Sequence, residues 1–147
     1  MITIIEQQTL DIDWFFNNGK DVGFVASGGG KLPDSIAKSL EKDQFLASFF
    51  RSLPLRSEVT INPDLDKIIP TRINETYLSD FIEMAQKGLF SFDKTVLNNF
   101  SDLHYHLVAK PVNPLKFDHL PLEIKKALAE SKFNGDIETM IDTSFVS

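Results

Sequence analysis

Residues 14–33 read WFFNNGKDVGFVASGGGKLP, and this stretch decides how the first part of the chain folds. Apolar residues alternate with other residues on both sides of the polar segment 17–21. This period of two is typical of two antiparallel strands that form a hairpin with one buried face. The three consecutive glycines that follow then separate the hairpin from the next element.

The length of the hairpin turn determines which residues of the two strands face each other. A two-residue turn at Asn18-Gly19 is common in hairpins, but here it would place the two apolar sets on opposite faces. A loop one residue longer pairs Trp14 with Phe24 and brings all the large apolar side chains to one face. We therefore predict the longer loop, with Trp14 as a core residue beneath a helix over residues 36–53.

The glycine run invites comparison with nucleotide-binding loops, but its spacing argues against one. A Walker loop needs a first glycine five residues before its Gly-Lys pair and a Ser or Thr directly after it. These two positions are Val25 and Leu32 in this chain. No glycine follows Gly30 at the spacing of the dinucleotide pattern either. We interpret the glycines as a flexible connection from a strand to a helix.

The composition indicates a single domain over residues 1–147 with a substantial core. Hydrophobic residues make up 42% of the chain, including 13 phenylalanines, so burial alone can drive folding. The chain has no cysteine, which excludes disulfides and thiolate metal sites and suits a reducing cytoplasm. The first residues lack the features of a secretory signal, and no apolar window is long enough to span a bilayer.

The clearest predicted helix covers residues 75–87. Asn74 is a good N-cap, and Gly88 follows at the position where glycine often ends a helix. Together with the hairpin, the other predicted elements give an α+β domain with about three helices and a small antiparallel or mixed sheet. The other predicted helices cover residues 34–53 and 121–131, and the first of them has an irregularity near 42–43. The other predicted strands cover residues 58–61, 104–109 and 137–141.

Negative charge is concentrated in the middle of the chain. The formal net charge of −6 disfavours binding to nucleic acid or to an anionic membrane. Between residues 58 and 83 the chain has six acidic residues and only two basic ones, Lys67 and Arg72. We predict a surface that attracts a basic protein partner; the alternative is a solvated polar face without a partner. The six acids are Glu58, Asp64, Asp66, Glu75, Asp80 and Glu83.

His104 and His106 are candidates for a metal or acid–base site. Alternate residues of a strand share a face, so both imidazoles could bind one ion. Asp102 would be the third ligand, and His119 is a further candidate. No second pair of ligands supports such a site, so we predict no metal and no cofactor. The alternative prediction is a metal site formed by Asp102, His104 and His106.

No serine or threonine lies in a recognisable nucleophile motif. Residues 35–38 have the Ser-x-x-Lys spacing, but the companion motifs of that chemistry are missing. A serine at the start of a helix accounts for Ser35 equally well. We therefore predict no catalytic residue.

The chain resembles a family of small bacterial proteins of uncharacterised function. The resemblance rests on Asp-Trp-Phe at 13–15, GFVASGG at 23–29, Pro33, KGLFSFD at 87–93 and Asn-Pro-Leu at 113–115. It implies a similarity to the immunity proteins that accompany bacterial polymorphic toxins. It carries no active-site residues.

Three hypotheses follow for the function. The first is a cytoplasmic, immunity-like binding module that blocks a toxin through its acidic surface. The second is a metal-dependent or acid–base enzyme that uses the strand with His104 and His106. The third is a protein that acts through the interface of a homo-oligomer.

Overall fold

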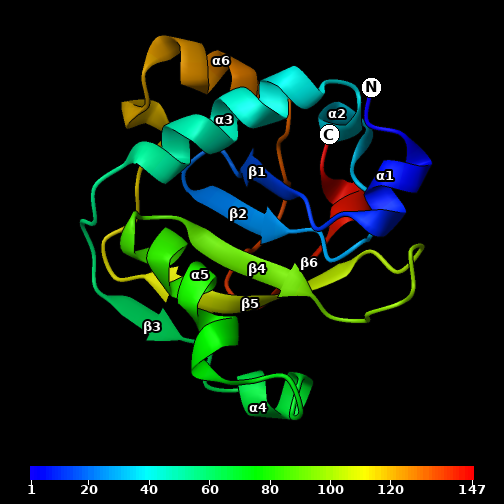
Figure 1. Cartoon of the computed structure of the whole chain (residues 1–147). Helices are drawn as coiled ribbons and strands as arrows, with labels where there is room; N and C mark the ends of the chain where they lie inside the picture. Colours follow the sequence, from blue (N-terminus) through cyan, green and yellow to red (C-terminus); the bar gives the residue numbers. More distant parts are fainter.

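A six-stranded mixed sheet forms the centre of the computed structural model, which describes all residues from 1 to 147 (Figure 1). The strands are β1 (Asp13–Asn17), β2 (Val22–Ala26), β3 (Val59–Ile61), β4 (Phe90–Lys94), β5 (His104–Pro111) and β6 (Met140–Asp142). Their order is β1-β2-β4-β5-β3, and β6 pairs with the first half of β5. Only β2 and β4 run parallel. The predicted α+β class and mixed sheet are confirmed.

Six α-helices surround the sheet, where about three were predicted. They are α1 (Ile4–Thr9), α2 (Asp34–Ala37), α3 (Leu40–Ser52), α4 (Leu65–Ile68), α5 (Glu75–Gln86) and α6 (Leu122–Ala129). Short 3-10 turns, η1 (Phe117–His119) and η2 (Thr143–Phe145), complete the fold. The three longest helices lie within the predicted ones, α2 is part of the predicted 34–53 helix, and the short α1 and α4 were not predicted. No helix has both the length and the apolar character needed to cross a membrane.

The predicted helix over 34–53 is two helices, and its irregularity lies earlier than expected. The break falls at residues 38–39, between α2 and α3, rather than near residues 42–43. Ser39 causes it, because its extended backbone and its side chain form the N-cap of α3. The hydroxyl oxygen accepts a hydrogen bond of 3.1 Å from the Lys42 backbone N–H.

Both faces of the sheet are buried, which corrects the assumption of a single buried face. Helices α3, α5 and α6 contribute to one hydrophobic cluster, together with Phe15 and Phe24. The opposite face packs against α2 and the C-terminal segment, and its cluster contains Trp14, Phe16 and Tyr105. Figure 1 shows α3 and α5 crossing the same side of the sheet, with α1, α2 and the C-terminus at its right end.

The register of the N-terminal hairpin also differs from the prediction. Trp14 pairs with Val25, and Phe15 pairs with Phe24, so four residues form the loop. Asn18 supports this wider loop, because its side-chain oxygen accepts hydrogen bonds from the backbone N–H groups of residues 20 and 21. Trp14 is a core residue as predicted, but Phe15 rather than Trp14 lies beneath α3.

Helix α5 has the two end signals that the sequence indicated. The side-chain oxygen of Asn74 accepts a hydrogen bond of 2.8 Å from the Tyr77 backbone N–H. Gly88 has a φ of +102°, which glycine adopts readily after a helix end. Together they fix both ends of the helix that carries three of the predicted site residues, Glu75, Asp80 and Glu83.

Replacing Asn74 with alanine is expected to lower the free energy of unfolding by about 1 kcal/mol, because the Tyr77 N–H loses its partner. Urea unfolding of the purified variant measures this loss. Thr76→Ala alters an exposed residue in the same helical turn and is expected to change stability by less than about 0.5 kcal/mol. Equal losses in both variants would contradict the assignment of the cap.

Candidate functional site: carboxylates around Arg51

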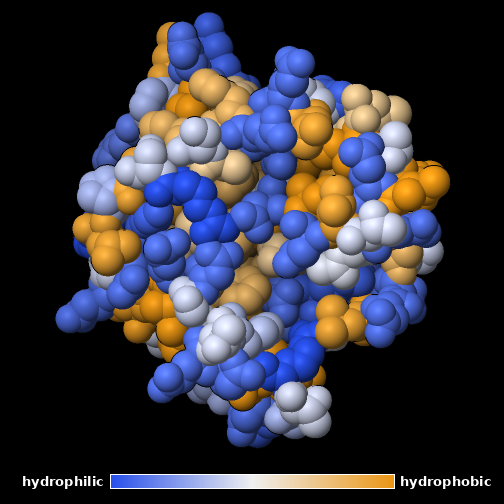
Figure 2. Space-filling model, viewed as in Figure 1, coloured by the Kyte–Doolittle hydropathy of each residue, from blue (hydrophilic) through white to orange (hydrophobic).

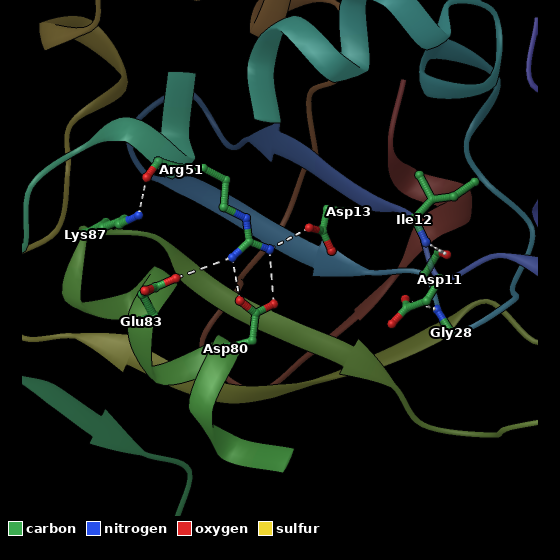
Figure 3. Close-up of polar contacts among 9 residues, drawn as sticks. Asp11, Ile12, Asp13, Gly28, Arg51, Asp80, Glu83 and Lys87 are labelled. Atoms are coloured by element: carbon green, nitrogen blue, oxygen red, sulfur yellow. Dashed lines mark hydrogen bonds and ion pairs between the residues drawn. The ribbon is translucent and has the colours of Figure 1, made fainter. Parts of the chain in front are cut away.

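The candidate site lies between α3 and α5, on the face of the molecule that Figure 2 shows. Hydrophilic side chains cover most of the surface between these two helices, whereas apolar side chains gather toward the side of α1. Arg51 in the last turn of α3 reaches into this polar region (Figure 3). Its guanidinium group is the centre of a cluster with three carboxylates, which we call the Arg51 cluster: Arg51, Asp13, Asp80 and Glu83.

Asp80 binds the guanidinium group through both of its carboxylate oxygens. Nη1 of Arg51 donates to one oxygen, and Nη2 donates to the other at 3.1 Å. Nη2 also donates to Asp13 Oδ2 at 2.5 Å, and Glu83 Oε2 lies 3.5 Å from Nη1. The paired geometry with Asp80 matches the fork of the guanidinium group and therefore fixes its orientation.

Three elements place these side chains. Asp80 and Glu83 are three residues apart on α5 and so share one helix face. Asp13 begins β1, beneath the end of α3. The Phe24 ring lies 5.4 Å from the guanidinium carbon, and Lys87 Nζ donates to the backbone carbonyl of Arg51. Arg51 is therefore held from both the sheet and α5.

The Arg51 cluster has more negative than positive charge. Three carboxylates surround one guanidinium group, whose pKa is raised above its usual range by the hydrogen bonds from Arg51 to Asp80. Burial raises the pKa of Asp13, although Arg51 opposes this effect. The side chains of Asp80 and Glu83 remain 47% and 51% exposed. They can therefore accept further hydrogen bonds from a cationic group outside the protein.

The structure brings together only two of the six predicted acids, Asp80 and Glu83. The other four are exposed on β3, α4 and α5 or directly beside them, and they make no contact with the Arg51 cluster. Asp64 pairs with Lys67 at 3.7 Å. The remaining three, Glu58, Asp66 and Glu75, form no ion pair.

The histidines of β5 lie in different surroundings. Asp102 Oδ1 is 3.3 Å from His104 Nδ1, and Asp142 Oδ2 is 3.7 Å from His104 Nε2. His106 is fully buried, with its Nδ1 2.9 Å from Thr95 Oγ1. His119 lies exposed in η1. The structure contains no group of three or more side chains arranged to hold a metal ion.

His106 belongs to a buried polar network beneath α5. Its Nε2 lies 3.5 Å from the Tyr77 hydroxyl, which donates to Asp93 Oδ2 at 2.6 Å. Arg72 approaches the same carboxylate oxygen at 3.5 Å and donates to the Lys94 carbonyl. Burial, with a smaller effect of Arg72, lowers the pKa of His106 to about 4. The network therefore keeps His106 neutral and holds the segment before α5 against β4.

The glycine run makes internal contacts. Gly28 N–H donates to Asp11 Oδ1 at 3.0 Å, as Figure 3 shows, and Gly30 N–H donates to the Ser27 carbonyl. A Cβ atom on Gly30 would lie 2.6 Å from the Tyr105 hydroxyl oxygen, so a larger residue does not fit there. The Asp11 carboxylate therefore accepts the hydrogen bond of the Gly28 N–H. In a phosphate-binding loop, such a backbone N–H would bind the phosphate.

Comparison with models of protein families, with curated proteins and with solved structures finds no match for this chain.

Proposed function

We propose that this protein is a binding module whose Arg51 cluster docks a basic protein, in the manner of an immunity protein that blocks a toxin. The observation that carries the proposal is the gathering of Asp13, Asp80 and Glu83 around a single arginine on a partly exposed surface. The resemblance to small bacterial immunity proteins agrees with this role.

The geometry suits recognition of a cationic side chain. Because Arg51 fixes the carboxylate of Asp80, an incoming lysine or arginine meets an acceptor that loses little freedom on binding. Glu83 is the most exposed carboxylate of the cluster and contacts Arg51 only at 3.5 Å, so it can turn toward the partner. The partner can thus bind without displacing Arg51.

The rest of the chain supports the approach of a basic partner. The net charge of −6 attracts positive proteins over about one Debye length, roughly 8 Å at physiological salt. The exposed Glu58, Asp66 and Glu75 have no basic partner within the chain and contribute to this net negative charge. Such complementarity mainly increases the rate of association.

The double variant Asp80→Asn/Glu83→Gln is expected to slow association with the cognate partner roughly tenfold at low salt. The amides keep the size of the side chains but remove two negative charges. The partner to test is the basic product of a gene next to the one that encodes this protein. Surface plasmon resonance at low and high salt measures the rate constants, and rescue of growth on co-expression reports neutralisation.

The matched control is Glu41→Gln/Glu123→Gln, which removes two exposed charges from the first turns of α3 and α6. This control is expected to retain nearly the parent association rate. The proposal is wrong if both double variants slow association equally, or if no neighbouring product binds. Urea unfolding of each variant checks that the fold is unchanged.

A further inference from the structure

A hollow of about 350 Å³ lies at the end of α3, apart from the carboxylates of the Arg51 cluster. Its apolar wall comes from the α3 C-cap residue Leu53, from Pro54, and from the buried Leu115. Its volume is near the lower end of the range for ligand sites, roughly 300–1,000 Å³. A small ligand therefore suits it.

The walls of the hollow are fixed by hydrogen bonds of the backbone. Arg56 N–H donates to the Gln86 carbonyl at 2.8 Å, and Leu115 N–H donates to the Gly88 carbonyl at 3.0 Å. Asn113 N–H donates to Ser57 Oγ at 2.8 Å. The first two hydrogen bonds connect the two sides of the hollow to the end of α5, and the third connects the sides to each other. The site is therefore formed before any ligand binds.

The polar groups at the hollow are donors without an anionic partner. Arg56 is exposed and forms no ion pair, whereas the other two arginines, Arg51 and Arg72, both contact carboxylates. The side-chain amide of Asn113 makes no hydrogen bond within the protein. Glu58, the nearest acid along the chain, does not pair with Arg56. Arg56 therefore has no carboxylate partner although acidic residues outnumber basic ones in this chain, and its guanidinium group is available to an anionic ligand.

Two exposed apolar residues are the chain neighbours of residues that line the hollow. Leu55 and Val112, next to Arg56 and Asn113 in the chain, are 61% and 62% exposed. Exposed apolar side chains around a concave site with one or two polar groups are typical of ligand-binding surfaces. The polar groups determine the charge that the ligand must carry.

We propose that this hollow binds a small molecule that joins an apolar body to one carboxylate. The apolar body packs against Leu53, Pro54 and Leu115. The carboxylate accepts hydrogen bonds from the Arg56 guanidinium group, whose fork matches its two oxygens, and from the Asn113 side-chain amide. This inference is independent of the proposed partner binding, because it uses none of the carboxylates in the Arg51 cluster.

Octanoate is the probe for this site, and amide resonances in two-dimensional NMR spectra report where it binds. Titration is expected to shift the resonances of Arg56, Asn113 and Leu115 along a saturable curve. Acetate has the carboxylate alone, and octylammonium has the same apolar chain with the opposite charge. Both are expected to bind at least roughly tenfold more weakly than octanoate.

Arg56→Gln is expected to weaken octanoate binding roughly tenfold, since it removes the charged donor. Lys126→Gln is the control, because Lys126 is also exposed, forms no ion pair and lies on α6. Three results would each overturn the inference: no saturable shift at the three amides, equal binding of octylammonium, or unchanged affinity in Arg56→Gln. The spectra also show whether each variant is folded.

Discussion

Replacing Trp14 with alanine is expected to lower the free energy of unfolding by about 3–5 kcal/mol. The indole ring is fully buried between the sheet and the C-terminal segment, and it packs edge-on against Tyr105 at 6.5 Å. Its N–H has no hydrogen-bond partner, so its stabilising effect comes from packing alone. Alanine leaves a cavity that the surrounding aromatic side chains of Phe16 and Tyr105 cannot fill without moving. Urea unfolding measures the loss.

Two variants separate packing from other causes. Trp14→Phe keeps most of the ring and removes the unpartnered N–H, so we expect it to cost far less than alanine. Phe145→Ala removes an exposed aromatic ring and is expected to cost less than about 1 kcal/mol. Trp14 is the only tryptophan, so its fluorescence reports burial directly. An emission spectrum typical of water, with unchanged stability in Trp14→Ala, would contradict the core assignment.

Local signals predicted those parts of the fold that depend on near neighbours in the chain. Asn74 and Gly88 bracket α5 because capping involves residues within a few positions. Period-two alternation likewise located β5. The irregularity in the 34–53 helix was misplaced, although Ser39 carries a capping signal that could have located it.

The hairpin register could not be derived from the hairpin itself. The expectation of one buried face made Trp14 and Phe24 appear to be partners, whereas they lie on opposite sides of a sheet that is buried on both. The second face is covered by Phe133, Ile137 and Ile141, more than one hundred residues later. Contacts at that separation leave no periodic signal near Trp14, and tertiary packing decides the register.

The candidate site was predictable only in part for the same reason. The three-residue spacing of Asp80 and Glu83 indicates a shared helix face. Arg51 and Asp13 join them because the connection from β2 to the parallel β4 places α3 and α5 on the same side of the sheet. The two-residue spacing of His104 and His106 did not predict that α5 covers His106 and leaves His104 exposed.

Replacing Asp43 with asparagine is expected to stabilise the protein by up to roughly 4 kcal/mol above about pH 7, and very little near pH 4. Asp43 lies on the buried face of α3, is only 5% exposed and has one carboxylate oxygen without a hydrogen bond. Burial, followed by the nearby charge of Asp13, raises its pKa from 3.8 to about 7. Asparagine has nearly the same shape and cannot ionise.

The direction of the pH dependence follows from proton binding. Between about pH 4 and about pH 7, the folded parent keeps a proton on Asp43 that the unfolded chain has lost. The stability of the parent therefore falls as pH rises through this window, by about 1.4 kcal/mol for each pH unit. The asparagine variant lacks this loss, so its advantage grows across the window and levels off above it.

Urea unfolding of both proteins at about pH 4 and about pH 8 measures this difference. Asp93, whose pKa burial also raises, remains in both proteins, so its contribution cancels in the difference between the two curves. Glu41→Gln, an exposed change on the same helix, is expected to alter stability by less than about 0.5 kcal/mol at either pH. If Asp43→Asn raises the free energy of unfolding equally at both pH values, packing determines the effect of the substitution. Ionisation of the buried carboxyl between α3 and β1 would then not be its cause.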